Sequence, residues 1–310
     1  AVGGIMIPSM EEEGYDAGFA SAIQTMGGIF GPIIPPSVLM VLYAVASGES
    51  VGDMLLAGLL PGLFLGLVLI VVVVMLCMRK GYKGSGRFSG RAAVKAFGDA
   101  FFALLAPVII LGGIYSGFMT PTEASAVCCF YCLLVGLFVY REIKITQVCK
   151  IVYDGVKSAA GIMIIVAATQ VFGWVITRAG IPQTVAKMFT SSISSPTVFL
   201  FAVCLILLVA GCFIDAVPAL LIFAPIFCPT AEAYGIDMVH FGVVMVIVLC
   251  IGLATPPVGI NLYVASSVGG QPVHKIIPHL PIPLLAITLG TIIVVLVPQI
   301  TTLLPALVNG

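Results

Sequence analysis

The amino-acid sequence predicts an all-α integral membrane protein with two inverted repeats, interrupted transmembrane helices and re-entrant helical hairpins. Of its 310 residues, 61% are hydrophobic and 8% are charged, whereas soluble domains carry about 25% charged residues. Two apolar runs contain the same interruption, Gly-x-x-x-Pro-Pro, at 31–36 and 252–257. Proline lacks a backbone N–H and its ring clashes with the preceding turn, so each interruption should unwind a helix at membrane depth.

A duplication relates the two interruptions. With a constant offset of 221, ten residues of 1–48 are identical to their counterparts in 222–269, and six of these ten are Gly or Pro. Glycine and proline are needed where the backbone adopts particular dihedral angles, so their agreement between the two copies indicates a shared fold. Paired interruptions in two halves of a chain are the best sequence indication of a transporter binding site.

The apolar runs predict the membrane segments, because about twenty apolar residues cross the hydrocarbon core as a helix. Two broken spans are expected at 17–47 and 238–268. Continuous spans are expected at 53–78, 98–117, 121–140, 154–177 and 280–305.

The apolar stretch 197–230 is interrupted around Gly211 and Asp215. It is too short for two full crossings and a turn, so a re-entrant hairpin is expected there. Residues 1–8 would be the outgoing arm of its counterpart. The counterparts of 205–221 would precede residue 1, so we expect that the natural N-terminus is missing.

The loops predict the orientation. Six basic residues and no acid lie between Arg79 and Lys95, which places that loop in the cytoplasm. Counting crossings puts 141–152 and 269–279 on the same side and 179–196 outside. Three crossings separate the repeats, so the second copy is inverted. The expected domains are 1–78 (end of the first repeat), 79–196 (basic loop and three connecting helices) and 197–310 (second repeat).

Asp215 is the only acid deep within an apolar segment. An intramembrane carboxylate is costly and is a functional candidate by default. It could instead cap the returning helix, three residues before Pro218, by accepting backbone N–H bonds. The two roles are compatible, and Asp215, Pro218 and Asn261 are the candidates for the hairpin tip or the substrate site.

The Gly-x-x-x-Pro-Pro breaks release carbonyl oxygens, which are the ligands that sodium prefers in transporters. Thr255 adds a hydroxyl, and Asn261 lies on the half-helix that follows. Structural kinks are the alternative. Because the two breaks are related by the repeat and each adjoins a hairpin, an ion or substrate site is favoured.

Other candidate motifs have structural explanations. Thr120, Pro121 and Glu123 fit a helix N-terminus with a capping box. The nine cysteines lack the spacing of a zinc site and are expected to pack as small apolar residues.

Four stretches together resemble the large membrane subunit of tripartite ATP-independent periplasmic (TRAP) transporters. They are 31–37 (GPIIPPS), 112–124 (GGIYSGFMTPTEA), 211–218 around Asp215, and 252–263 (GLATPPVGINLY). The resemblance implies an elevator-type, sodium-driven importer of organic acids in the bacterial inner membrane. It also implies two partners, a small four-helix membrane subunit and a periplasmic substrate-binding protein. No cofactor beyond sodium ions and no nucleic-acid partner are expected.

The resemblance also assigns the sodium ligands. One site would include Gly31, Ile34 and Pro35 with the first hairpin. The second would join Gly211 to the other break, at the residues Gly252, Thr255 and Val258.

Three other functions compete with this one. A related sodium-coupled anion transporter could work without a binding protein. An intramembrane enzyme needs two converging acids or an Asp-rich metal cluster, and Asp215 alone cannot supply either, so no enzyme is expected. A purely structural scaffold leaves the duplicated breaks unexplained.

Overall fold

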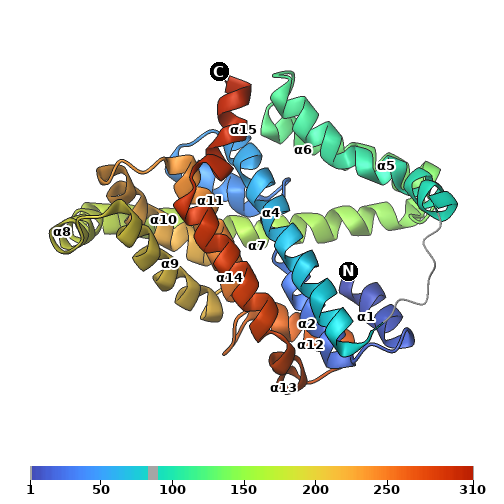
Figure 1. Cartoon of the computed structure of the whole chain (residues 1–310). Coiled ribbons are helices and arrows are strands. Elements are labelled where there is room, and N and C mark those ends of the chain that lie inside the picture. Colours follow the sequence, from blue (N-terminus) through green and yellow to red (C-terminus); the bar gives the residue numbers. More distant parts are fainter. Residues whose placement is uncertain (1, 83–89, 310) are drawn as a thin grey trace. The chain divides into compact units, whose positions relative to one another are not determined.

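The computed structural model describes residues 2–82 and 90–309, and these residues contain helices and no strands (Figure 1). The chain divides into two compact units, one made of Ala1–Ser85 with Phe172–Gly310 and the other of Gly86–Val171. In the described residues, six helices are long and apolar enough to cross a membrane, or up to seven if a bent pair counts as one span. The predicted all-α membrane fold is therefore confirmed.

The first repeat lies in the larger unit and contains four helices. They are α1 (Val2–Glu12), α2 (Ala17–Gly28), α3 (Val38–Ser47) and α4 (Val51–Lys80). The first broken span is α2 followed by α3, with the backbone unwound over 29–37 between them. Ser37 caps α3 by accepting from the N–H of Met40, and Gly48 ends it in the left-handed conformation.

The second repeat follows the same plan later in this unit. It contains α9 (Pro196–Phe213), α10 (Ala216–Ala233), α11 (Met238–Leu253), α12 (Ile260–Gly269), α13 (Val273–Ile276), η2 (Ile277–His279), α14 (Pro281–Leu296) and α15 (Gln299–Asn309). The amphipathic helix α8 (Ile181–Ser192) precedes it and packs on α10. The second broken span is α11 followed by α12.

The two repeats agree in their hydrogen bonds. Asp16 Oδ1 accepts from the N–H of Phe19 at 2.8 Å, and Asp237 Oδ1 accepts from the N–H of His240 at 2.8 Å. Two residues earlier, Gly14 and Gly235 both adopt a positive φ, of 86° and 68°. The peptide bond between the two prolines is cis in both breaks. The duplication is therefore present in the backbone itself.

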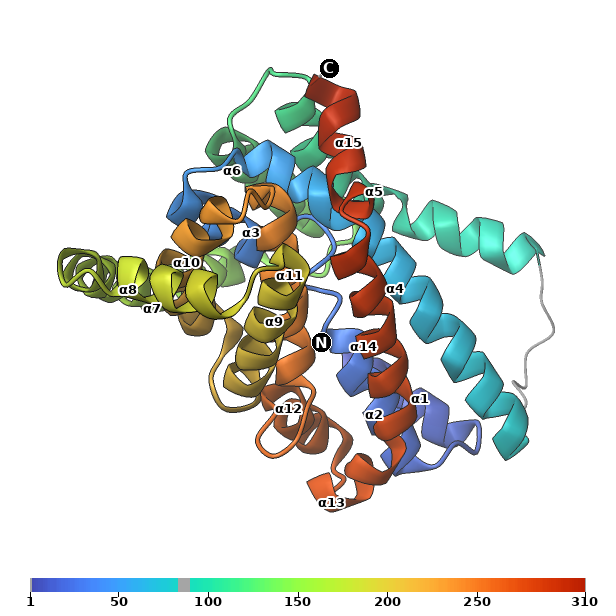
Figure 2. The same ribbon diagram turned by 60° about the vertical axis from the view of Figure 1, so that its left-hand side comes forward.

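The broken spans run antiparallel to each other. Near the end of α3, Tyr43 donates from its hydroxyl to the carbonyl of Met238, at the start of α11, at 2.9 Å. At the end of α12, a Cβ built on Gly269 would lie 2.6 Å from Oγ of Ser21, near the start of α2. The end of each span thus packs on the start of the other, as inverted repeats require (Figure 2).

Two details of the predicted spans are wrong. The span expected at 280–305 is divided between α14 and α15, because Pro298 has no N–H to continue the helix. The length of the stretch 197–230 does not exclude two crossings, contrary to the expectation above. Its helices α9 and α10 have 18 residues each, both apolar enough to span, and extend about 27 Å at 1.5 Å per residue. The re-entrant path itself stays a prediction.

The smaller unit contains α5 (Gly90–Tyr115), α6 (Pro121–Leu134), the π-helical turn η1 (Val135–Val139) and most of α7 (Ile145–Arg178). Within it, α5 packs on α6, and Tyr131 donates to the carbonyl of Phe102 at 2.8 Å. The predicted capping box is present, because Thr120 and Glu123 each accept from the other's backbone N–H. Residues 83–89 of the predicted basic loop, including Lys83 and Arg87, lie outside the described residues.

Candidate functional site

The second break lies directly against the end of α9. A Cβ built on Gly252 would be 2.6 Å from Cα of Gly211, and one built on Gly211 would be 2.9 Å from the carbonyl oxygen of Leu249. Only glycine on both sides allows this approach. Gly259, just after the prolines, donates its N–H to the carbonyl of Cys212 at 3.0 Å. The structure therefore brings together Gly211 and Gly252, the two residues that the family resemblance assigns to one sodium site.

Backbone oxygens converge at this second break. After α11 ends at Leu253, Ala254 and Thr255 form a tighter turn, in which their N–H groups donate to the carbonyls of Ile251 and Gly252 at 3.0 and 2.9 Å. Gly259 then takes a positive φ of 56°, and a Cβ built there would lie 2.8 Å from the Thr255 carbonyl oxygen and 3.2 Å from that of Leu253. Two carbonyls thus point to one side of Gly259.

The Thr255 hydroxyl donates to the carbonyl of Ile251 at 2.7 Å. A hydroxyl that donates one bond keeps acceptor lone pairs, so its oxygen can also bind a cation. Among the described residues, no group of three His, Cys, Asp or Glu side chains could hold a metal ion. A cation at this break would therefore be held by backbone and hydroxyl oxygens, with the half-buried Val258 next in the chain.

The first break has the same backbone and different surroundings. Ile33 and Ile34 donate to the carbonyl of Phe30 at 3.1 and 2.8 Å, and the Ser37 hydroxyl donates to the carbonyl of Pro32. Pro35 is buried, whereas Gly31 is exposed, and a Cβ built on Gly31 would meet only the carbonyl of Gly28, at 3.7 Å. Within the described chain, Gly31 thus has no close neighbour like that of Gly252.

A cavity of about 380 Å³ opens beside Gly31. Its lining comes from α1, the end of α2 and one face of α12, and includes Gln24, Thr25, Gly28 and Asn261. A Cβ built on Gly28 would be 3.4 Å from Nδ2 of Asn261, so this amide faces the first break. None of the described lining residues is charged. The Asn261 amide of the second repeat is therefore placed near the break of the first repeat.

Asp215 caps α10, as the sequence predicts. Its Oδ1 accepts from the N–H of Val217 at 2.9 Å, and its side chain is exposed. Pro218 lies in the first turn of the same helix. Neither residue is among those that line the cavity at Asn261. Of the three candidates for a hairpin tip or substrate site, Asp215 and Pro218 therefore lie together at the start of α10, whereas Asn261 lies at the cavity.

The whole chain, over residues 1–309, matches the family described as "Tripartite ATP-independent periplasmic transporter, DctM component". The chain belongs to this family. It is a large permease subunit of a TRAP transporter.

Curated relatives match most or all of this permease. It is 39% identical to the sialic acid TRAP transporter large permease protein SiaM of Vibrio cholerae, over 100% of this chain and 72% of the relative. It is 42% identical to the C4-dicarboxylate TRAP transporter large permease protein DctM of Pseudomonas aeruginosa, over 98% and 71%. It is 32% identical to the 2,3-diketo-L-gulonate large permease YiaN of Escherichia coli, over 86% and 63%.

The family assignment and the apolar spans make this TRAP permease a multi-pass protein of the bacterial inner membrane. Its relatives are named as transporter permeases, which confirms that it is not an enzyme.

Sequence reasoning missed Gly259, Gln24 and Thr25 in this TRAP permease. Gly259 follows a Pro-Pro pair, and a glycine there is a signal of a positive φ that could have been used. Gln24 and Thr25 carried no such signal, because they line the cavity only as a result of the packing of α12 against α2.

Proposed function

We propose that this permease subunit forms the membrane part of a sodium-coupled importer of organic acids. The observation that supports this most is the Gly211–Gly252 contact, beside which the carbonyls of Leu253 and Thr255 converge. Uncharged backbone oxygens in a glycine-lined site suit a hard monovalent cation such as sodium. The predicted ligands here are Gly211, Gly252, Thr255 and Val258, with Gly31, Ile34 and Pro35 at the first break.

The substrate class rests on the relatives and on the electrostatics of the cavity. The relatives named above carry sialic acid, C4-dicarboxylates and 2,3-diketo-L-gulonate, which are all organic acids. The cavity at Gly31 and Asn261 offers two amides, a hydroxyl and no charged side chain among its described lining residues. An anion there would need bound cations and the positive ends of half-helices for compensation. Coupling to sodium supplies those cations.

The partners and the motion in this proposal are those that the family resemblance implies. A small four-helix membrane subunit and a periplasmic substrate-binding protein would complete the transporter. The antiparallel broken spans would move together as the transporting element, in an elevator-type cycle. The alternative, an anion transporter without a binding protein, has no observation in its favour, and the family assignment points away from it.

Replacing Thr255 by alanine tests the sodium site. The substitution removes one oxygen while the prolines stay, and unpairing a buried polar partner costs about 1–3 kcal/mol. Half-maximal uptake should then need about ten-fold more sodium. Uptake into proteoliposomes that contain the complete transporter measures this.

Two variants serve as controls. Thr255→Ser keeps the hydroxyl and should behave as the parent does. Thr184→Ala removes an equivalent hydroxyl bond, from Thr184 Oγ1 to the Gly180 carbonyl at 2.9 Å, at the start of α8, which packs on α10. If Thr255→Ala is expressed normally and has the parent's sodium dependence, Thr255 is not a ligand.

A further inference from the structure

The helix that follows the first broken span, α4, meets the first break through two of its glycines. A Cβ built on Gly58 would lie 2.8 Å from the carbonyl oxygen of Ile33, and one built on Gly62 would lie 2.7 Å from Cγ1 of Ile34. Both glycines are buried, as is Ile33, and Ile34 is half-buried. Only glycine fits at either position unless the break itself shifts.

These contacts fix the backbone on both sides of Ile34. The peptide group before it places its carbonyl against Gly58 and donates its N–H to the carbonyl of Phe30 at 2.8 Å. The Ile34 side chain lies against Gly62, and the residue that follows, Pro35, is buried. Within the described chain, no hydrogen bond to the Ile34 carbonyl is seen. This carbonyl is therefore available to a cation, and its direction is set by the packing against α4.

The second repeat holds its break in a different way. With the offset of 221, Thr255 stands where the first repeat has Ile34, so the second break offers a hydroxyl where the first offers only a backbone carbonyl. A Leu-Pro pair common to both repeats aligns α14 with α4 and puts Ile282 in the place of Gly62. Ile282 is 54% exposed, so it does not hold a break. The support from the following helix is thus specific to the first repeat.

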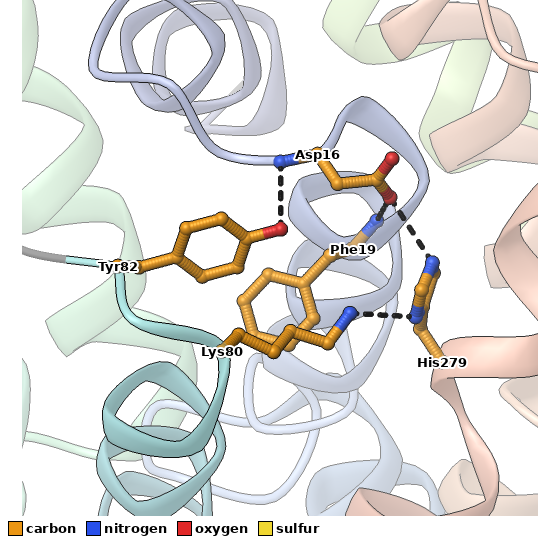
Figure 3. Close-up of polar contacts among 5 residues, drawn as sticks. All are labelled: Asp16, Phe19, Lys80, Tyr82 and His279. Atoms are coloured by element: carbon orange, nitrogen blue, oxygen red, sulfur yellow. Dashed lines mark hydrogen bonds and ion pairs between the residues drawn. The ribbon is translucent and has the colours of Figure 1, made fainter.

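The position of α4 is itself fixed, both along the helix and at its C-terminal end (Figure 3). The Lys80 ammonium lies 3.3 Å from Nδ1 of His279, and the Tyr82 hydroxyl accepts from the N–H of Asp16 at 3.2 Å. Along the helix, α3, α14 and α15 pack on α4. A methyl group added at Gly62 would therefore displace the break, whose unwound backbone lacks regular helical hydrogen bonds, and not α4.

We propose that Gly58 and Gly62 are positioning residues for a sodium ion at the first break. Neither glycine touches the ion. They hold the backbone so that the Ile34 carbonyl points at it. A site made of backbone oxygens cannot adapt by changing a rotamer, so its affinity depends on holding them to within about 0.5 Å. The inference rests on the proposed function and deepens it, because it names the helix that shapes the first sodium site.

Gly62→Ala tests this role by adding one methyl group beside Ile34. A side chain branched at Cβ is stiff, so the backbone of the break must yield. The complete transporter, purified in detergent, is titrated with sodium chloride, and choline chloride keeps the ionic strength constant. Sodium that binds the folded state raises the melting temperature. We expect Gly62→Ala to need at least two-fold more sodium for half of this rise.

Two further variants separate positioning from packing in general. Gly66→Ala, one turn further along α4, would meet only the ring of Phe30, at 3.9 Å, and should keep the sodium requirement of the parent. Ile34→Ala removes the side chain that Gly62 holds, so it should itself raise the requirement at least two-fold. Residues in contact have non-additive effects, so adding Gly62→Ala to Ile34→Ala should raise it no further.

The parent protein tests the proposed function separately. If sodium and choline have the same effect on its melting temperature, sodium coupling is contradicted and the positioning role falls with it. In a sodium-dependent parent, three results overturn the positioning role alone. They are an unchanged sodium requirement in Gly62→Ala, a loss of stability in choline without such a change, and additive effects in the double variant. Ile34→Ala creates no clash, so its sodium requirement decides the same question if Gly62→Ala does not fold.

Discussion

The breaks of the two repeats have the same backbone and different neighbours. At Gly252 the backbone of Gly211 lies so close that no side chain fits between them. At Gly31 the nearest atom to an added Cβ is 3.7 Å away, and a cavity adjoins the residue. The comparison shows that a shared motif fixes where a helix unwinds. What the unwound backbone binds is decided by the element that packs against it.

The largest effect is expected from a methyl group at the sealed break. Gly252→Ala would place Cβ 2.6 Å from Cα of Gly211, and forcing such an atom into a packed site costs about 1–3 kcal/mol. Gly31→Ala meets only ordinary contact in the described chain and should cost less than about 1 kcal/mol. Thermal unfolding of both variants of this 310-residue chain in detergent compares them. If Gly252→Ala and Gly31→Ala lower the thermal stability equally, the packing around the two breaks does not differ in the way described here.

A smaller effect is expected at the cap of α10. Asp215 accepts one backbone N–H, and asparagine can do the same, so Asp215→Asn should leave both stability and uptake nearly unchanged. Asp215→Ala removes the acceptor and should lower the free energy of unfolding by about 1 kcal/mol. A well-expressed Asp215→Asn variant without uptake would show instead that the negative charge takes part in transport.

The smallest effect concerns the acids around the cap of the second repeat. Burial, followed by Asp237, Asp53 and Glu232, raises the pKa of Glu49. A raised carboxyl pKa favours the folded state while the group is protonated, and that contribution is lost as pH rises through the folded pKa.

Glu49→Gln should therefore stabilise the protein at pH 7, by at most about 1 kcal/mol because the group is partly solvated. The gain should vanish at a pH below the ordinary range for glutamate, where Glu49 is protonated in both states. Thermal unfolding at the two pH values measures this. A larger gain at the acidic pH would mean that the acids around Asp237 do not repel Glu49.

Patterns along the chain were enough to predict the fold and part of the candidate site. The offset that relates Asp16 to Asp237 indicated a shared backbone, and the equivalent caps of α2 and α11 agree with it. The close contact of Gly211 with Gly252 was implied by the family resemblance and not by the glycine pattern itself. Hydropathy alone missed the division at Pro298, because an isolated proline barely changes the average of an apolar run. The cavity at Asn261 and the Lys80–His279 contact, between residues 199 apart, depend on packing between repeats, which no local pattern encodes.

The contact between Tyr43 and Met238 also has a consequence for biosynthesis, because it joins residues 195 apart. At about 5–20 residues per second, a ribosome needs roughly 10–40 seconds to make the chain between them. During that interval the first broken span enters the bilayer without the half-helices that later pack on it. Uncovered, unwound backbone is costly in lipid. The nascent first repeat is therefore the stage at which insertion chaperones and membrane proteases can act on this chain.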